Sequence, residues 1–168
     1  MFKKLLLAVV LALPISVFAQ KFGTVNLEQV FQAMPESAAM RTQLSDASKK
    51  YETEFQKLQE EINKLYTDYQ TIQNDPNTPE SIKERRIQEI QERAQKVDEF
   101  RNTAEQELAK LQQQLSAPIQ QKITDAVKAV GQEGGFTMLL PNDPGLILYS
   151  GADVVDVTAT VKSKLGIK

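Results

Sequence analysis

Carboxylates form the most reactive pattern in this sequence, and Glu60 and Glu61 are an adjacent pair of them. Two carboxylates can divide acid and base roles when a pocket separates their pKa values. This pair lies among alternating acidic and basic residues, which is typical of a solvated helix face. The 168 residues include no His and no Cys, so thiol nucleophiles, zinc–thiolate sites and an imidazole base are excluded. We therefore expect no enzymatic activity, no catalytic residues, no metal site and no cofactor.

The other side chains that could bind a partner are apolar, and they recur every three or four positions between residues 40 and 115. Such spacing places them along one side of a long helix, as in a coiled coil. Two series are separated by the proline-containing segment 74–79. The first series is Met40, Leu44, Ala47, Tyr51, Phe55, Leu58, Ile62, Leu65, Tyr69 and Ile72, and the second is Ile82, Ile87, Ile90, Ala94, Val97, Phe100, Ala104, Leu108, Leu111 and Leu115.

The two series match each other as an antiparallel hairpin. The position numbers of Ile62 and Ile90 add to 152, and those of Tyr51 and Phe100 add to 151. A nearly constant sum requires a turn centred near residue 76, where Pro76 removes a backbone donor. We predict a coiled-coil hairpin arm over residues 35–117, with its tip near 74–79.

The same register makes a prediction about the tip. It places Tyr69 opposite Lys83 and Tyr66 opposite Arg86, so cation–aromatic contacts are expected there.

Aromatic and branched residues of the arm have two open roles, filling the seam between the helices or contacting a bound polypeptide. The seam is favoured for residues whose register partners are apolar, which are Tyr51, Phe55 and Phe100. Neither role is favoured for the residues nearer the tip, which are Tyr66, Tyr69, Ile72 and Ile82.

The chain ends, residues 20–34 and 118–168, are predicted to form a small β-rich head that mediates oligomerisation. Strands are expected at 22–27, 136–140 and 146–149, the last two joined as a hairpin by the turn-rich residues 141–145. Asn26 is expected to cap a short helix, and Asp156 a last one that ends near Gly166. The residues expected in the head core or at a subunit interface are Phe22, Val25, Leu27, Phe31, Phe136, Leu139, Leu146, Leu148 and Tyr149.

Oligomerisation is expected because three short strands are marginal for an independent domain and leave exposed edges. This argument does not choose between two, three and four chains.

The first residues have the pattern of a secretory signal peptide. Lys3 and Lys4 precede an apolar run from Leu5 to Leu13, and cleavage is predicted after Ala19. The run is too short to span a bilayer, so no stable membrane insertion is expected. Cleavage removes two of the 20 basic residues, leaving 18 basic against 22 acidic residues. This excess of negative charge does not favour the binding of nucleic acid.

The order of these features resembles the Skp/OmpH family of periplasmic chaperones. An opening strand with Val25-Asn26 and Val30-Phe31 precedes Pro35, a long Gln/Glu/Lys-rich hairpin and the closing "FTMLLPNDPGLILYSGADVVDVT". The resemblance implies an α+β fold in which a long antiparallel helical hairpin projects from a small β-strand head. It also implies a homotrimer with a shared β-body.

In function, the resemblance implies a nucleotide-independent holdase. It would bind unfolded outer-membrane β-barrel proteins in a cavity between the arms and pass them to the barrel assembly machinery. A lipopolysaccharide site is not inferred, because the chain is mildly acidic. The alternative is a structural coiled-coil spacer or adaptor in the cell envelope.

Overall fold

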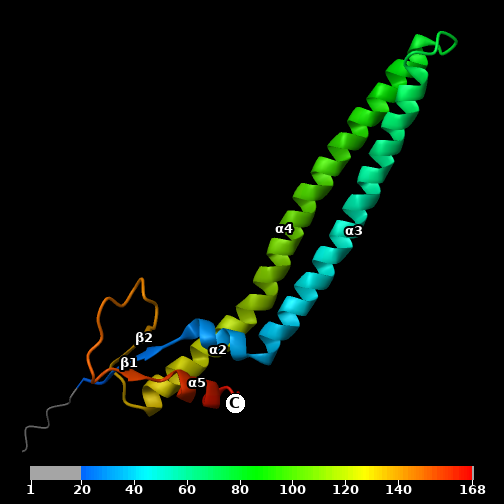
Figure 1. Cartoon of the computed structure of the whole chain (residues 1–168). Coiled ribbons are helices and arrows are strands. Elements are labelled where there is room, and N and C mark those ends of the chain that lie inside the picture. Colours follow the sequence, from blue (N-terminus) through cyan, green and yellow to red (C-terminus); the bar gives the residue numbers. More distant parts are fainter. Residues whose placement is uncertain (1–19, 168) are drawn as a thin grey trace, which may run out of the picture.

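The computed structural model describes residues 20–167, and the predicted signal peptide lies outside them. Two long helices lie side by side as an arm that projects from a small head (Figure 1). The arm helices are α3 (Pro35–Ile72) and α4 (Glu80–Glu133). The head contains β1 (Phe22–Val25), α2 (Leu27–Ala33), β2 (Met138–Pro141), β3 (Val155–Asp156) and α5 (Thr158–Lys164), together with the last part of α4.

The predicted hairpin register is confirmed by the packing of α3 on α4. Ile62 and Ile90 are both buried, and the rings of Tyr51 and Phe100 have centroids 6.0 Å apart. Pro35 occupies the first turn of α3, where its missing N–H leaves no intrahelical bond unmade. The arm is therefore a continuous two-helix coiled coil from its base to its tip.

Helix α4 continues through Pro118 into the head, where α3 no longer accompanies it. A proline inside a helix removes the bond to the carbonyl four residues earlier, here that of Gln114, and favours a bend. Residues 114 and 118 are both exposed, so water can satisfy that carbonyl. Beyond Pro118 the apolar side of α4 packs on the head, as its sequence predicts.

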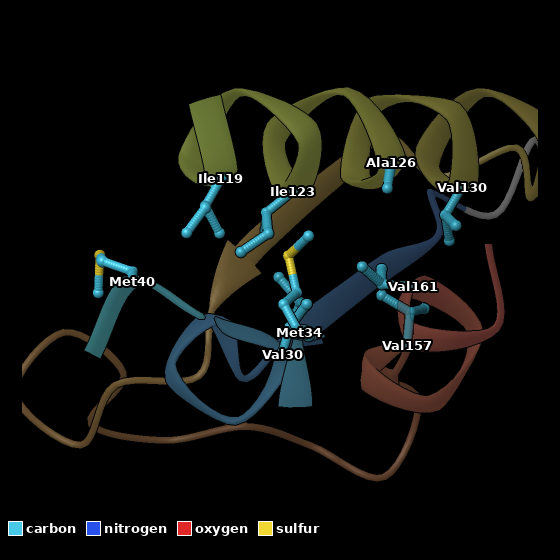
Figure 2. Close-up of a cluster of buried hydrophobic side chains, with 10 residues drawn as sticks. Val30, Met34, Met40, Ile119, Ile123, Ala126, Val130, Val157 and Val161 are labelled. Carbon is cyan, nitrogen blue, oxygen red and sulfur yellow. The ribbon is translucent and has the colours of Figure 1, made fainter. Parts of the chain in front are cut away.

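The head core lies between α4, α2 and α5 (Figure 2). Ile119, Ile123 and Val130 point from α4 toward Val30 and Val161, both of which are completely buried. Asn26 caps α2 through a 2.8 Å bond from the backbone N–H of Gln29, and the Asp156 carboxylate accepts the N–H of Thr158 at the start of α5. The predicted cap of α2 is confirmed, whereas Val157 occupies the N-cap position of α5 and Asp156 precedes it by one residue.

The three strands form a parallel sheet in the order β2-β1-β3, so the opening strand is central. The predicted strand hairpin is wrong. Strand β2 ends at Pro141, which has no N–H to donate, and Asp143 then accepts N–H groups of Gly145, Leu146 and Ile147 in a turn. Residues 146–149 consequently form no strand, and the third strand is Val155–Asp156.

Ser37 is completely buried at the base of the arm, and its hydroxyl has no hydrogen-bond partner. A buried hydroxyl without a partner lowers stability by about 1 kcal/mol or more. Ser37→Ala is therefore expected to raise the free energy of unfolding by about 1 kcal/mol in urea titrations. Ser48→Ala, at an exposed position of the same helix, measures how much the free energy of unfolding rises from the higher helix propensity of alanine alone. Equal gains in the two variants would contradict the prediction.

Candidate binding surfaces of the arm and head

The arm residues predicted for either seam or binding divide by their exposure, and this division does not follow their distance from the tip. Tyr51, Phe55 and Phe100 are half-buried between the helices, as expected for seam residues. Tyr69 and Ile72 are half-buried as well. Tyr66 and Ile82 are 50% and 46% exposed, and they have the surface that contact with another polypeptide needs.

Ile87 is a further exposed apolar residue near the tip, and sequence reasoning assigned it to the seam. Its register partner is Leu65, which is only half-buried. The burial of Ile62 and Ile90 gives way to partial exposure within one helical turn toward the tip. The distal arm therefore presents Tyr66, Ile82 and Ile87 at its surface.

The predicted cation–aromatic contacts at the tip are wrong. Arg86 instead pairs with Glu89 at 2.7 Å, and Lys83 lies 3.8 Å from Glu80. These i,i+3 partners lie on the same helix and are reached without crossing the seam. Among residues 20–167, the cation–π contact that the structure contains is in the head, where Lys21 lies 4.1 Å from the ring centroid of Phe136.

The tip turn is organised by the carboxylate of Asp75. It accepts the backbone N–H of Asn77 at 3.0 Å and the hydroxyl of Thr78 at 2.8 Å. The Asn77 N–H, followed by the Thr78 hydroxyl, holds the pKa of Asp75 below its ordinary value. The ionised carboxylate is thus the form that orders the turn.

The order of the tip turn is expected to depend on pH. Because the folded-state pKa of Asp75 is lowered, its stabilisation is complete above the ordinary carboxyl pKa and is lost as pH falls through the lowered value. The amide proton shift of Asn77, followed by NMR, should titrate with that carboxyl. In Asp75→Ala this titration should vanish, and its persistence would show that another group controls the turn.

The predicted head residues also divide into buried and exposed sets. Val25 is in the core, and Phe31, Phe136 and Leu139 pack against it. The remaining five are exposed in the single chain: Phe22, Leu27, Leu146, Leu148 and Tyr149. Leu148 is 95% exposed, so core packing within one chain is wrong for the residues of this loop, and a subunit interface stays a prediction.

A surface groove near the base of the arm was not predicted. It consists of two neighbouring cavities of about 240 and 550 Å³ that share Gln43 as a lining residue. We call it the base groove. Its apolar lining includes Ala39, Met40, Ala47, Tyr51, Leu111 and Leu115. Both alanines belong to or adjoin the apolar stripe, and their small size was the signal that could have indicated a hollow.

Charged residues also line the base groove. Lys122 donates a 2.7 Å hydrogen bond to Glu36 across the first cavity, and Asp46 and Lys50 line the second. The bond from Lys122 lowers the pKa of Glu36. The lining of the groove therefore combines apolar residues with charged residues of both signs.

Residues 20–167 contain no cluster of three or more potential metal ligands of the His, Cys, Asp or Glu type. No helix within them is long and apolar enough to cross a membrane.

A long helical hairpin on a small head with a parallel sheet defines a class of coiled-coil-armed proteins. Comparison with known proteins then identifies the family. The family model described as OmpH, outer membrane protein (OmpH-like), matches residues 21–165, and the chain belongs to this family.

Two curated relatives share the name Chaperone protein Skp. The one from Yersinia enterocolitica is 28% identical over 156 residues, with 92% of each chain covered. The one from Photorhabdus laumondii is 29% identical over 169 residues, covering 95% of this chain and 98% of the relative. Both names describe chaperones, in agreement with the expectation that the protein is not an enzyme.

Proposed function

We propose that this protein is a periplasmic holdase chaperone that binds unfolded outer-membrane β-barrel proteins and prevents their aggregation without ATP. The observation that carries the proposal is the match of nearly the whole chain to the OmpH-like family, with similar curated members named as chaperones. Bound clients lie between helical arms and pass from there to the barrel assembly machinery.

The dimensions and surface of the arm support this function. Helix α3 has 38 residues and is about 57 Å long, yet the arm has no globular core of its own. An unfolded barrel protein exposes alternating apolar side chains and unpaired strand edges, which aggregate when they meet other copies. A long arm with Tyr66, Ile82 and Ile87 exposed can shield such a chain through many weak contacts.

The head assembles as a homotrimer in this proposal. The loop residues Leu146, Leu148 and Tyr149 are exposed in one chain, and β2 and β3 each have an unpaired edge. Exposed apolar residues beside open strand edges favour burial against further copies.

The trimer makes a direct prediction about Leu148. Leu148→Glu should shift sedimentation from a trimer toward smaller species, whereas Asp153→Glu, at an exposed position of the same loop, should leave it unchanged. A monomer in the unsubstituted protein, or a trimer unaffected by Leu148→Glu, would contradict this arrangement.

The test of the chaperone function is light scattering after dilution of a urea-unfolded outer-membrane barrel protein into buffer without nucleotide. The mature protein is expected to suppress scattering at a molar ratio of about one oligomer per client molecule, because the arms of one oligomer enclose one client. Absence of suppression at severalfold excess would refute the holdase function. It would favour the spacer or adaptor instead, and a folded partner would then be sought at residues 66–86.

A further inference from the structure

The base groove differs from the distal arm because its apolar residues are set in a hollow. Ala39 and Ala47 leave room beside the larger Met40, Tyr51 and Leu115, and Gln43 lines both cavities. A hollow of this kind can accept whole side chains, whereas Tyr66 and Ile82 offer only projecting surface. The arm thus has two distinct apolar surfaces along its length.

We propose that the base groove holds an extended segment of the unfolded client, with alternate apolar side chains pointing into it. This inference rests on the proposed holdase function and assigns a place on the arm to the bound polypeptide. The client segment lies along the groove with its polar side chains turned toward solvent.

The length of the groove fits such a segment. Its lining residues on α3 run from Glu36 to Tyr51, which is about 22 Å along the helix. An extended chain covers about 22 Å with seven residues, at roughly 3.3 Å each. A transmembrane strand of a barrel has about 9–11 residues, so the groove accommodates most of one strand. Three or so side chains of one face then enter it.

The charges beside the groove favour a segment without net charge. Glu36 and Lys122 neutralise each other through their hydrogen bond, and Asp46 and Lys50 have opposite signs. Neither a strongly acidic nor a strongly basic segment gains from this arrangement. The lipid-facing residues of barrel strands are apolar and uncharged, so they match the lining.

Crosslinking from single cysteines can test this placement, because the chain has none of its own. Gln43→Cys and Lys50→Cys place a benzophenone label at the groove, and Ser45→Cys and Glu52→Cys serve as controls. Each control lies two residues farther along α3, which is about 200° around the helix. All four positions are exposed. We expect severalfold more crosslinking to a urea-unfolded barrel protein from the groove positions.

A charge placed in the groove gives an independent measurement. Ala39→Glu adds a second carboxylate to the first cavity, where the one lining cation, Lys122, already pairs with Glu36, whereas Ala38→Glu makes the same change one residue earlier, about 100° around the helix. Both alanines are exposed, so both variants should fold. Ala39→Glu should weaken client binding about tenfold, and Ala38→Glu should leave it unchanged.

The outcomes separate this inference from the proposed function. If groove and control positions crosslink equally and scattering is still suppressed, client binding in the groove is refuted while the holdase function stands. Crosslinking of Gln43→Cys to a second copy without client also overturns it, because the groove would then be a contact between subunits. Failure of the unsubstituted protein to suppress scattering overturns both.

Discussion

Gly23→Ala is expected to destabilise the head by about 2 kcal/mol, although alanine is usually the better residue inside a strand. A Cβ at this position would lie 2.7 Å from Leu139 Cδ2, 2.8 Å from the Phe136 ring and 2.9 Å from the carbonyl oxygen of Val155. The last of these is backbone of the neighbouring strand β3. The sheet must therefore separate to accept one methyl group.

Amide exchange can measure this loss where the strands meet. The N–H of Thr137 donates to the carbonyl oxygen of Lys21, and the N–H of Val157 donates to that of Thr24. The exchange rates of these two amide protons therefore measure how firmly the neighbouring strands are paired with β1. Their protection should fall in Gly23→Ala. Gly151→Ala is the matched control, because its Cβ would meet only the Tyr149 hydroxyl at 3.9 Å. Unchanged protection in Gly23→Ala would mean that β1 is not held as closely as described.

Shortening the arm is expected to have the largest effect on function. Replacing residues 66–86 by a tight turn joins Leu65 to Ile87, which the register places opposite each other. Seven residues are lost from each helix, so the arm becomes about 10 Å shorter. A holdase that encloses its client should then fail severalfold more often with large barrel proteins than with small ones, as scattering would show.

A full-length control separates the effect of arm length from the effect of the exposed apolar side chains. The double variant Tyr66→Ser and Ile82→Ser keeps the arm length and removes two exposed apolar side chains. If enclosure matters most, this variant should retain more suppression than the shortened one. Full suppression by the shortened protein would contradict a role for the distal arm in holding client.

The arm was the part of the fold that sequence could predict well. Seam residues such as Ile62 and Ile90 repeat with the period of the helix, and a local turn gives both helices a common register. The contact of Tyr51 with Phe100 follows from that register alone. The tip contacts of Lys83 and Arg86 were missed because acidic neighbours on the same helix compete for those cations.

The head was harder to predict because its pairing is not local. Strand β3 has only two residues, too few to show an alternating pattern. The segment 146–149 has a strand-like composition but pairs with no strand among residues 20–167, and the turn around Asp143 directs it away from β2. The base groove was missed because cavities depend on the space that small residues such as Ala47 leave between helices.

The central position of β1 determines when the head can fold. Its first hydrogen-bonded neighbour, β2, begins at Met138, and its second at Val155. Contacts so distant along the chain form slowly, whereas the helices of a hairpin meet through a short local turn. When the chain is synthesised from its N-terminus, the opening strand therefore has no partner strand until residues 138–141 have appeared, and no second one until residues 155–156 have. The helical arm therefore forms first, and the sheet of the head forms after it.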